Sequence, residues 1–186
     1  MKSCVAFEGA RRIAAGELTK VALAAKRVLD RGERGPVLIF DENTSEPIEV
    51  DFRGSPDDVL RRIEGVPEER RSPGRPKLGV VGREVTLLPR HWEWLNSQPG
   101  GASVALRKLV EEARRANAGR DRIRQAQEAA YRFMSAMAGN EVGFEEAIRA
   151  FFAGKRERFE DIIERWPKDV RDHAKKLAAA AFTGGI

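Results

Sequence analysis

The sequence predicts an α+β protein built from three parts that differ in composition and apolar spacing. Short apolar segments joined by turns predict an antiparallel ββαββα unit at residues 1–64. A stretch rich in proline, glycine and charge at residues 65–78 predicts an exposed linker. We expect a central strand-helix-helix unit at residues 79–118 and a C-terminal bundle of short helices at residues 119–186.

The N-terminal unit is expected to contain four short strands and two helices. Cys4 stands in the first apolar strand and reads as a small buried residue. Ser55 followed by Pro56 and two acidic residues is typical of a helix start. The expected strands are Cys4–Phe7, Arg12–Ala14, Pro36–Phe40 and Pro47–Phe52, and the helices are Glu17–Asp30 and one that opens at Ser55.

Composition limits the class of protein. The chain has 186 residues, of which 41% are hydrophobic and 34% charged, which indicates a globular and strongly solvated protein. No apolar stretch approaches the ~20 residues that a membrane helix needs, and no signal-peptide core follows the N-terminus. A single cysteine fits a reducing compartment, so we expect a cytoplasmic location and no membrane partner.

The positive charge gathers in the middle of the chain. Residues 61–140 hold 16 lysines and arginines against 9 acidic residues, whereas the whole chain has a net charge of +5. An excess of this kind points to an anionic partner, with nucleic acid first. The alternative is a solubilising surface rich in arginine.

The central segment carries a recognisable order of elements. Residues 80–88 read as a strand that ends at Leu88-Pro89, a short helix follows from His91, and Gly101-Ala102-Ser103 precedes a long amphipathic helix. This order resembles the ribbon-helix-helix fold of bacterial repressors and antitoxins. The resemblance implies a homodimer whose paired strands enter the DNA major groove, while Ser103 and the amides near Gly101 hold a phosphate.

The register of the strand leaves two readings open. If Leu88 points inward, then Arg83, Val85 and Leu87 face DNA, and two of these are poor base readers. If Val85 and Leu87 point inward, Thr86 faces DNA together with an acidic neighbour. The unit could therefore dimerise without reading DNA.

A basic arm precedes this unit. Ser72–Lys77 resembles the Gly-Arg-Pro core of an AT-hook, in which an extended arginine-rich strand lies in the minor groove, although Pro73 replaces an arginine of that motif. A plain flexible linker is the alternative reading. The residues predicted to contact DNA are Arg71, Arg75, Lys77, Arg83, Thr86, Ser103 and Arg107.

Other chemistry is not indicated. His91 and His173 are far apart, and no cysteine or carboxylate cluster joins either at metal-ligand spacing. The sequence has no glycine-rich phosphate loop and no evident nucleophile and base pair. We therefore expect no cofactor and no metal, name no catalytic residue, and leave a ligand of the N-terminal unit undefined.

Nearly the whole chain resembles an uncharacterised bacterial domain-of-unknown-function family (2239). The matching stretches are Ala6–Ala14, Gly74–Val80, Val85–Trp92 and Ala129–Met134. This resemblance implies no activity. The hypothesis from sequence is a dimeric DNA-binding regulator. The alternatives are an assembly module in which the central unit only dimerises, and an enzyme whose site forms between lobes.

Overall fold

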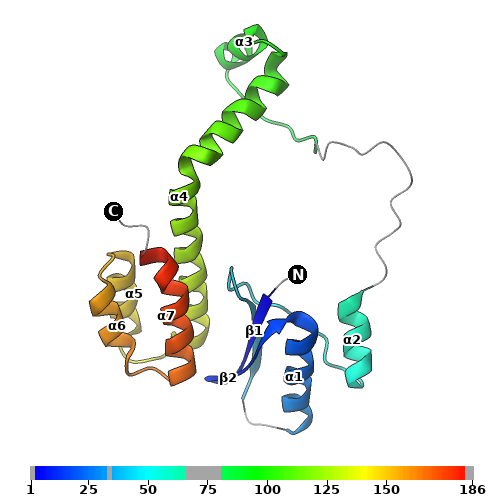
Figure 1. Cartoon of the computed structure of the whole chain (residues 1–186), viewed down its shortest axis with the longest axis vertical. Coiled ribbons are helices and arrows are strands. Elements are labelled where there is room, and N and C mark those ends of the chain that lie inside the picture. The colour runs from blue at the N-terminus through cyan, green and yellow to red at the C-terminus, as the bar shows by residue number, and fades with distance from the viewer. Residues whose placement is uncertain (1–2, 33–34, 66–80, 183–186) are drawn as a thin grey trace. The chain divides into compact units, whose positions relative to one another are not determined.

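The computed structural model describes residues 3–32, 35–65 and 81–182. By its contacts the chain divides into two compact units, Met1–Val66 together with Arg120–Ile186, and Pro67–Gly119. We call these the larger unit and the central unit. The mixed α+β class predicted from the sequence is confirmed, with N-terminal strands and helices through the rest of the described chain (Figure 1).

A three-stranded antiparallel sheet forms the middle of the larger unit. Its order is β2 (Arg11–Glu17), β1 (Ser3–Glu8) and β3 (Val37–Asp41). Side chains of a strand alternate between faces, so Cys4 and Ala6 of β1 join one core while Val5 and Phe7 join another. The central strand is thus buried on both faces, which explains its unbroken apolar run, and Cys4 is buried as predicted.

One face of the sheet is covered by the helix that follows β2. In α1 (Leu18–Asp30), Val21 and Ala25 pack with Cys4 and Ala6. Helix α2 (Pro56–Glu64) lies against α1 and begins with a capping box, because the Ser55 hydroxyl accepts from the Asp58 amide and the Asp58 carboxylate accepts from the Ser55 amide. The helix start predicted at Ser55 is confirmed.

The opposite face of the sheet packs against helices from the end of the chain. These are the later part of α4 (Gly101–Ala138), α5 (Phe144–Phe152), α6 (Arg156–Ile163) and α7 (Lys168–Phe182). Phe133 of α4 brings its ring within 5.4 Å of Phe7 and 5.6 Å of Phe40, centroid to centroid. Both ends of the chain therefore share one hydrophobic core.

Three predicted elements differ from the structure. Residues 47–52 form only a single bridge, Phe40 to Pro47, which is made by the Asp41 amide donating to the Glu46 carbonyl and the Ile48 amide donating to the Ile39 carbonyl, so the N-terminal order is ββαβα. The described part of the predicted central strand, residues 81–88, has no strand pairing within the chain. The helices expected before and after residue 119 are one continuous helix, α4.

The tight turn after β3 holds an unusual serine. Ser45 is fully buried, has a φ of +53°, and its hydroxyl has no hydrogen-bond partner among the described residues. The turn is otherwise well bonded, because the Asp41 carboxylate accepts from the amides of Asn43 and Thr44. Ser45 therefore combines backbone strain with an unsatisfied buried hydroxyl.

We predict that Ser45→Gly stabilises the protein. Glycine adopts positive φ freely and removes the hydroxyl, which together should outweigh its larger unfolded-state entropy and raise the unfolding free energy by about 1 kcal/mol. Urea denaturation measures the change. Ser45→Ala is the matched control, since it removes only the hydroxyl and should gain less. A Ser45→Gly variant less stable than the natural protein would contradict this account.

A buried histidine lies in the same core. His173 of α7 is 3% exposed, its ring lies 4.5 Å from that of Phe133, and its Nε2 has no hydrogen-bond partner among the described residues. Burial, helped by the nearby charge of Lys176, lowers the pKa of His173 to about 4, against a small opposing effect of Glu42. The folded protein therefore holds this ring neutral at mildly acidic pH.

This lowered pKa predicts acid sensitivity above the range in which carboxylates protonate. Between pH 6.5 and about 5, His173 binds a proton in the unfolded chain but stays neutral in the folded protein. The free energy of unfolding should therefore decrease by up to about 1.4 kcal/mol for each unit by which the pH is lowered. Urea titrations of the natural protein and of His173→Phe measure this slope. An unchanged slope in the variant would contradict the assignment.

Candidate nucleic-acid interface

The central unit contains two helices joined by a glycine turn. Helix α3 (Pro89–Ser97) begins with proline at its first position, where the missing amide costs nothing. Leu95 of α3 is 3% exposed and Ala105 of α4 is 7% exposed. These are the only two residues among those described in the unit that are buried. The unit therefore has too small a core to account for its apolar content.

The turn between the helices requires glycine. Gly100 and Gly101 have φ of +87° and +76°, and a Cβ on Gly100 would lie 3.1 Å from Cβ of Val104. Helix α4 begins at Gly101, so Ser103 lies within its first turn. The sequence predicted that Gly101-Ala102-Ser103 precedes the helix, whereas these residues are its first three.

Large apolar side chains of the central unit are left open to solvent. Val85 is 53% exposed, Trp94 of α3 is 51% exposed, and Val110 of α4 is 63% exposed. Single exposed apolar residues are ordinary, whereas several on consecutive segments are typical of proteins that bind a partner there. We call the following set the central apolar surface: Val81, Val85, Leu88, Trp92, Trp94, Leu109 and Val110.

The predicted contact residues divide by location. Arg83 and Thr86 are exposed on the segment 81–88, and Ser103 and Arg107 are exposed on the first two turns of α4. The Arg107 Nε donates to the Ser103 carbonyl at 3.1 Å, so the structure brings this pair together. Among the described residues, no hydrogen bond or ion pair joins Ser103 or Arg107 to Arg83 or Thr86. Arg71, Arg75 and Lys77 lie outside the described residues.

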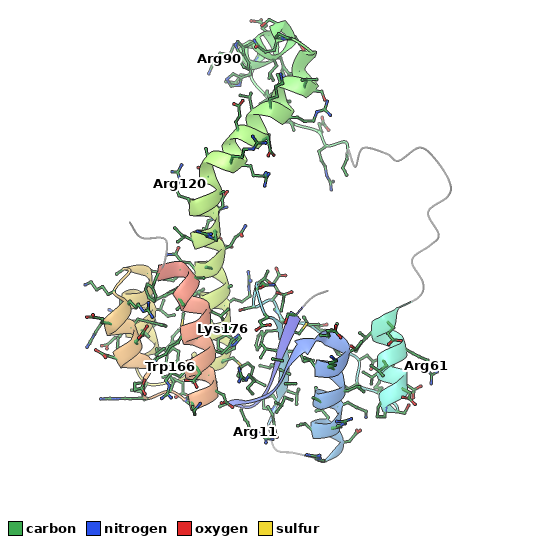
Figure 2. The ribbon with its side chains drawn as sticks, viewed as in Figure 1. Arg11, Arg61, Arg90, Arg120, Trp166 and Lys176 are labelled. Atoms are coloured by element: carbon green, nitrogen blue, oxygen red, sulfur yellow. The ribbon has the colours of Figure 1, made fainter. Side chains whose placement is uncertain are left out.

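The charged side chains of α4 pair with one another along the helix. Figure 2 shows side chains projecting around the helix along its length. From residue 107 to residue 125 every side chain is exposed or half-buried. Glu111 accepts from Arg114 at 2.8 Å and from Arg115 at 3.0 Å, which lowers the pKa of its carboxyl. This part of α4 is a solvated helix laced by ion pairs.

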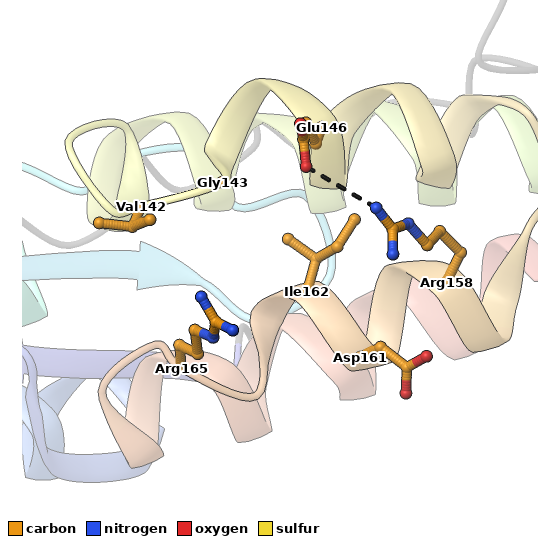
Figure 3. A pocket seen from close by; sticks show the side chains of 7 residues that line it. All are labelled: Val142, Gly143, Glu146, Arg158, Asp161, Ile162 and Arg165. Atoms are coloured by element: carbon orange, nitrogen blue, oxygen red, sulfur yellow. Dashed lines mark ion pairs between the residues drawn. The ribbon is translucent and has the colours of Figure 1, made fainter.

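A pocket of about 310 Å³ lies between α5 and α6 in the larger unit (Figure 3). Arg158 and Glu146 face each other across it at 3.9 Å, while Asp161 points away. None of its lining residues is a serine, threonine, cysteine, histidine, lysine or tyrosine. The pocket thus presents the ion pair of Glu146 with Arg158, together with Asp161 and Arg165, and its lining holds no hydroxyl, thiol, amine or imidazole group.

The described part of the chain contains no group of three or more histidine, cysteine or acidic residues placed to hold a metal ion. No described helix is both long and apolar enough to cross a membrane. Trp166 is 3% exposed and donates to the Val142 carbonyl at 3.3 Å, so this tryptophan is a core residue.

The fold and this surface define a mixed α+β protein whose central helices expose an unpartnered apolar face. The chain belongs to the family described as an uncharacterized protein conserved in bacteria (DUF2239), whose model matches residues 3–178. The predicted membership is confirmed. Neither a curated protein nor a solved structure matches the chain.

Proposed function

We propose that this protein binds DNA as a homodimer, in a regulatory role, through the segment 81–88 and the start of α4. The central apolar surface carries the proposal, because a strand and two helices cannot bury such a set alone. A second copy supplies both the missing strand partner and the missing cover. Pairing of two 81–88 segments gives a two-stranded ribbon, which is a size that the DNA major groove accepts.

Charge supports DNA as the ligand. The first turn of α4 has Ser103 exposed and Arg107 one turn beyond it. Free amides at a helix start attract a phosphate, and an arginine one turn on adds a bidentate donor. Arg83 and Thr86 stand on opposite faces of the segment, so one of them faces the groove in either register.

A second candidate is an assembly module in which the central unit only dimerises. It is favoured by Glu84, which shares a face with Thr86 and would repel phosphates if that face met DNA. It is also favoured by the apolar Val85 and Leu87 on the opposite face. Both candidates require the dimer and differ only in the ligand.

The dimer has its own test. We predict that Leu109→Glu with Val110→Glu converts a dimer to a monomer, because these side chains are 43% and 63% exposed and need cover from a second copy. Light scattering after size exclusion measures the mass. Val142→Glu is the control, since it changes an apolar side chain that is 75% exposed in the larger unit. A natural protein that stays monomeric at high concentration would contradict the proposal.

DNA binding is tested by anisotropy with a labelled random-sequence duplex at about 50 mM and about 200 mM salt. We predict binding that weakens steeply with salt. Arg107→Gln should weaken binding to all duplexes similarly and lower the salt slope by about 1 for each copy that loses a phosphate contact. Arg27→Gln on α1 is the control for net charge.

The two candidates give different outcomes in this experiment. A dimer that fails to bind any duplex at low salt would remove the DNA function and favour the assembly module. Thr86→Ala and Arg83→Ala then separate the registers in a binding dimer. The variant on the face that reads bases should lose discrimination between duplexes, whereas the other should lose only affinity.

A further inference from the structure

A row of basic side chains follows one side of the exposed part of α4. Arg107 and Arg114 are separated by seven residues, and so are Lys108, Arg115 and Arg122 in turn. Seven residues make about two helical turns, so these five residues share one side of the helix. We call them the basic stripe. It runs over about 22 Å at 1.5 Å per residue.

The side chains of the basic stripe are exposed to solvent, and nearly all charges along it are positive. The side chains of Arg114 and Arg115 are 71% and 76% exposed. Glu111 is the acidic residue within it, and both arginines bind that carboxylate. Lys108 and Arg122 have no acidic partner among the described residues. Subtracting one carboxylate from five basic groups leaves a local charge of +4.

We infer that the basic stripe of α4 binds the phosphate backbone of a nucleic acid as a second contact surface. Four of its five members are arginines, whose planar guanidinium suits bidentate contact with phosphate. A straight row of charge of this length matches a linear polyanion better than it matches a small anion. The inference rests on the proposed function for its ligand class, shares Arg107 with it, and adds Lys108, Arg114, Arg115 and Arg122.

The stripe is separate from the helix start. A phosphate held by the first amides of α4 lies on the helix axis, whereas the stripe faces sideways. One phosphate therefore cannot satisfy both, and the stripe must contact further phosphates along the backbone or on a second segment. Its loss should lower affinity without changing which sequences are preferred.

A membrane surface fits this helix less well. Helices that lie in the membrane interface bury large apolar residues opposite their basic face. Over the span of the stripe, residues 107–122, the large apolar residues of α4 are Leu109 and Val110, both near its start, and the others are Ala113, Ala116 and Ala118. Arg120 and Arg124 also lie on the side away from the stripe. These features favour a polyanion that contacts only the basic side.

The test compares three charge variants of the full chain in the anisotropy titration. The first is Arg114→Gln, Arg115→Gln and Arg122→Gln together. The second replaces the same three arginines with lysine, which retains charge and shows that the helix tolerates substitution. The third is the matched control of equal charge loss in the larger unit: Lys20→Gln, Arg61→Gln and Arg158→Gln, whose side chains are 79%, 76% and 64% exposed.

We expect the glutamine stripe variant to bind a duplex about tenfold or more weakly, with a salt slope reduced by up to about 2.7 per chain. The lysine variant should keep most of the affinity, and the control should match the natural protein. Far-ultraviolet circular dichroism checks that helix content is the same in all three.

Two results would overturn the inference while leaving the proposed function intact. One is a stripe variant that binds duplex as tightly as the control does. The other is unchanged duplex affinity together with lost binding to phosphatidylserine vesicles, which would assign the stripe to a membrane surface. A natural protein that binds no duplex would remove the proposed function and this inference together.

Discussion

The packing of Phe133 against Phe7 and Phe40 is the interaction on which the larger unit depends. It joins the N-terminal sheet to the helices of the last third of the chain, with ring centroids 5.4 Å and 5.6 Å apart. His173 lies against the same phenylalanine at 4.5 Å. Because Phe133 is held there, the second half of α4 belongs to this core, and the helix is anchored at its C-terminal end.

The middle of α4 is open to solvent. Residues 107–125 expose or half-expose every side chain, and Leu109 and Val110 are among them. A helix of this kind is stabilised locally by alanines and by pairs such as Arg114 with Glu111. Such local interactions keep the helix formed but do not bury Leu109. The proposed dimer would bury the apolar side chains, and the proposed nucleic-acid ligand would pair with the basic ones.

Sequence reasoning succeeded where the signal was local. The capping box at Ser55 and the apolar run at Cys4 determine their own elements, and both were predicted. It failed where a distant partner decides. The chain leaves the expected hairpin after the single bridge at Pro47, and Gly119 in a polar stretch gave no sign that α4 runs through it. Of the predicted contact residues, Ser103 and Arg107 were brought together, whereas Arg83 and Thr86 were placed only on an exposed segment.

The segment 81–88 is the part of the central unit that the proposed dimer would change most. An isolated strand gains no ladder hydrogen bonds, so its backbone groups stay with solvent and its apolar side chains stay exposed, as at Val85. The alternating apolar residues of this segment therefore do not stabilise the monomer. Pairing with an identical segment supplies hydrogen bonds and burial at the same time, because an antiparallel pair presents the same side chains from both strands. A twofold dimer would bury the apolar side chains of Val85, Trp94 and Val110, and would so recover the free energy that their exposure costs the monomer.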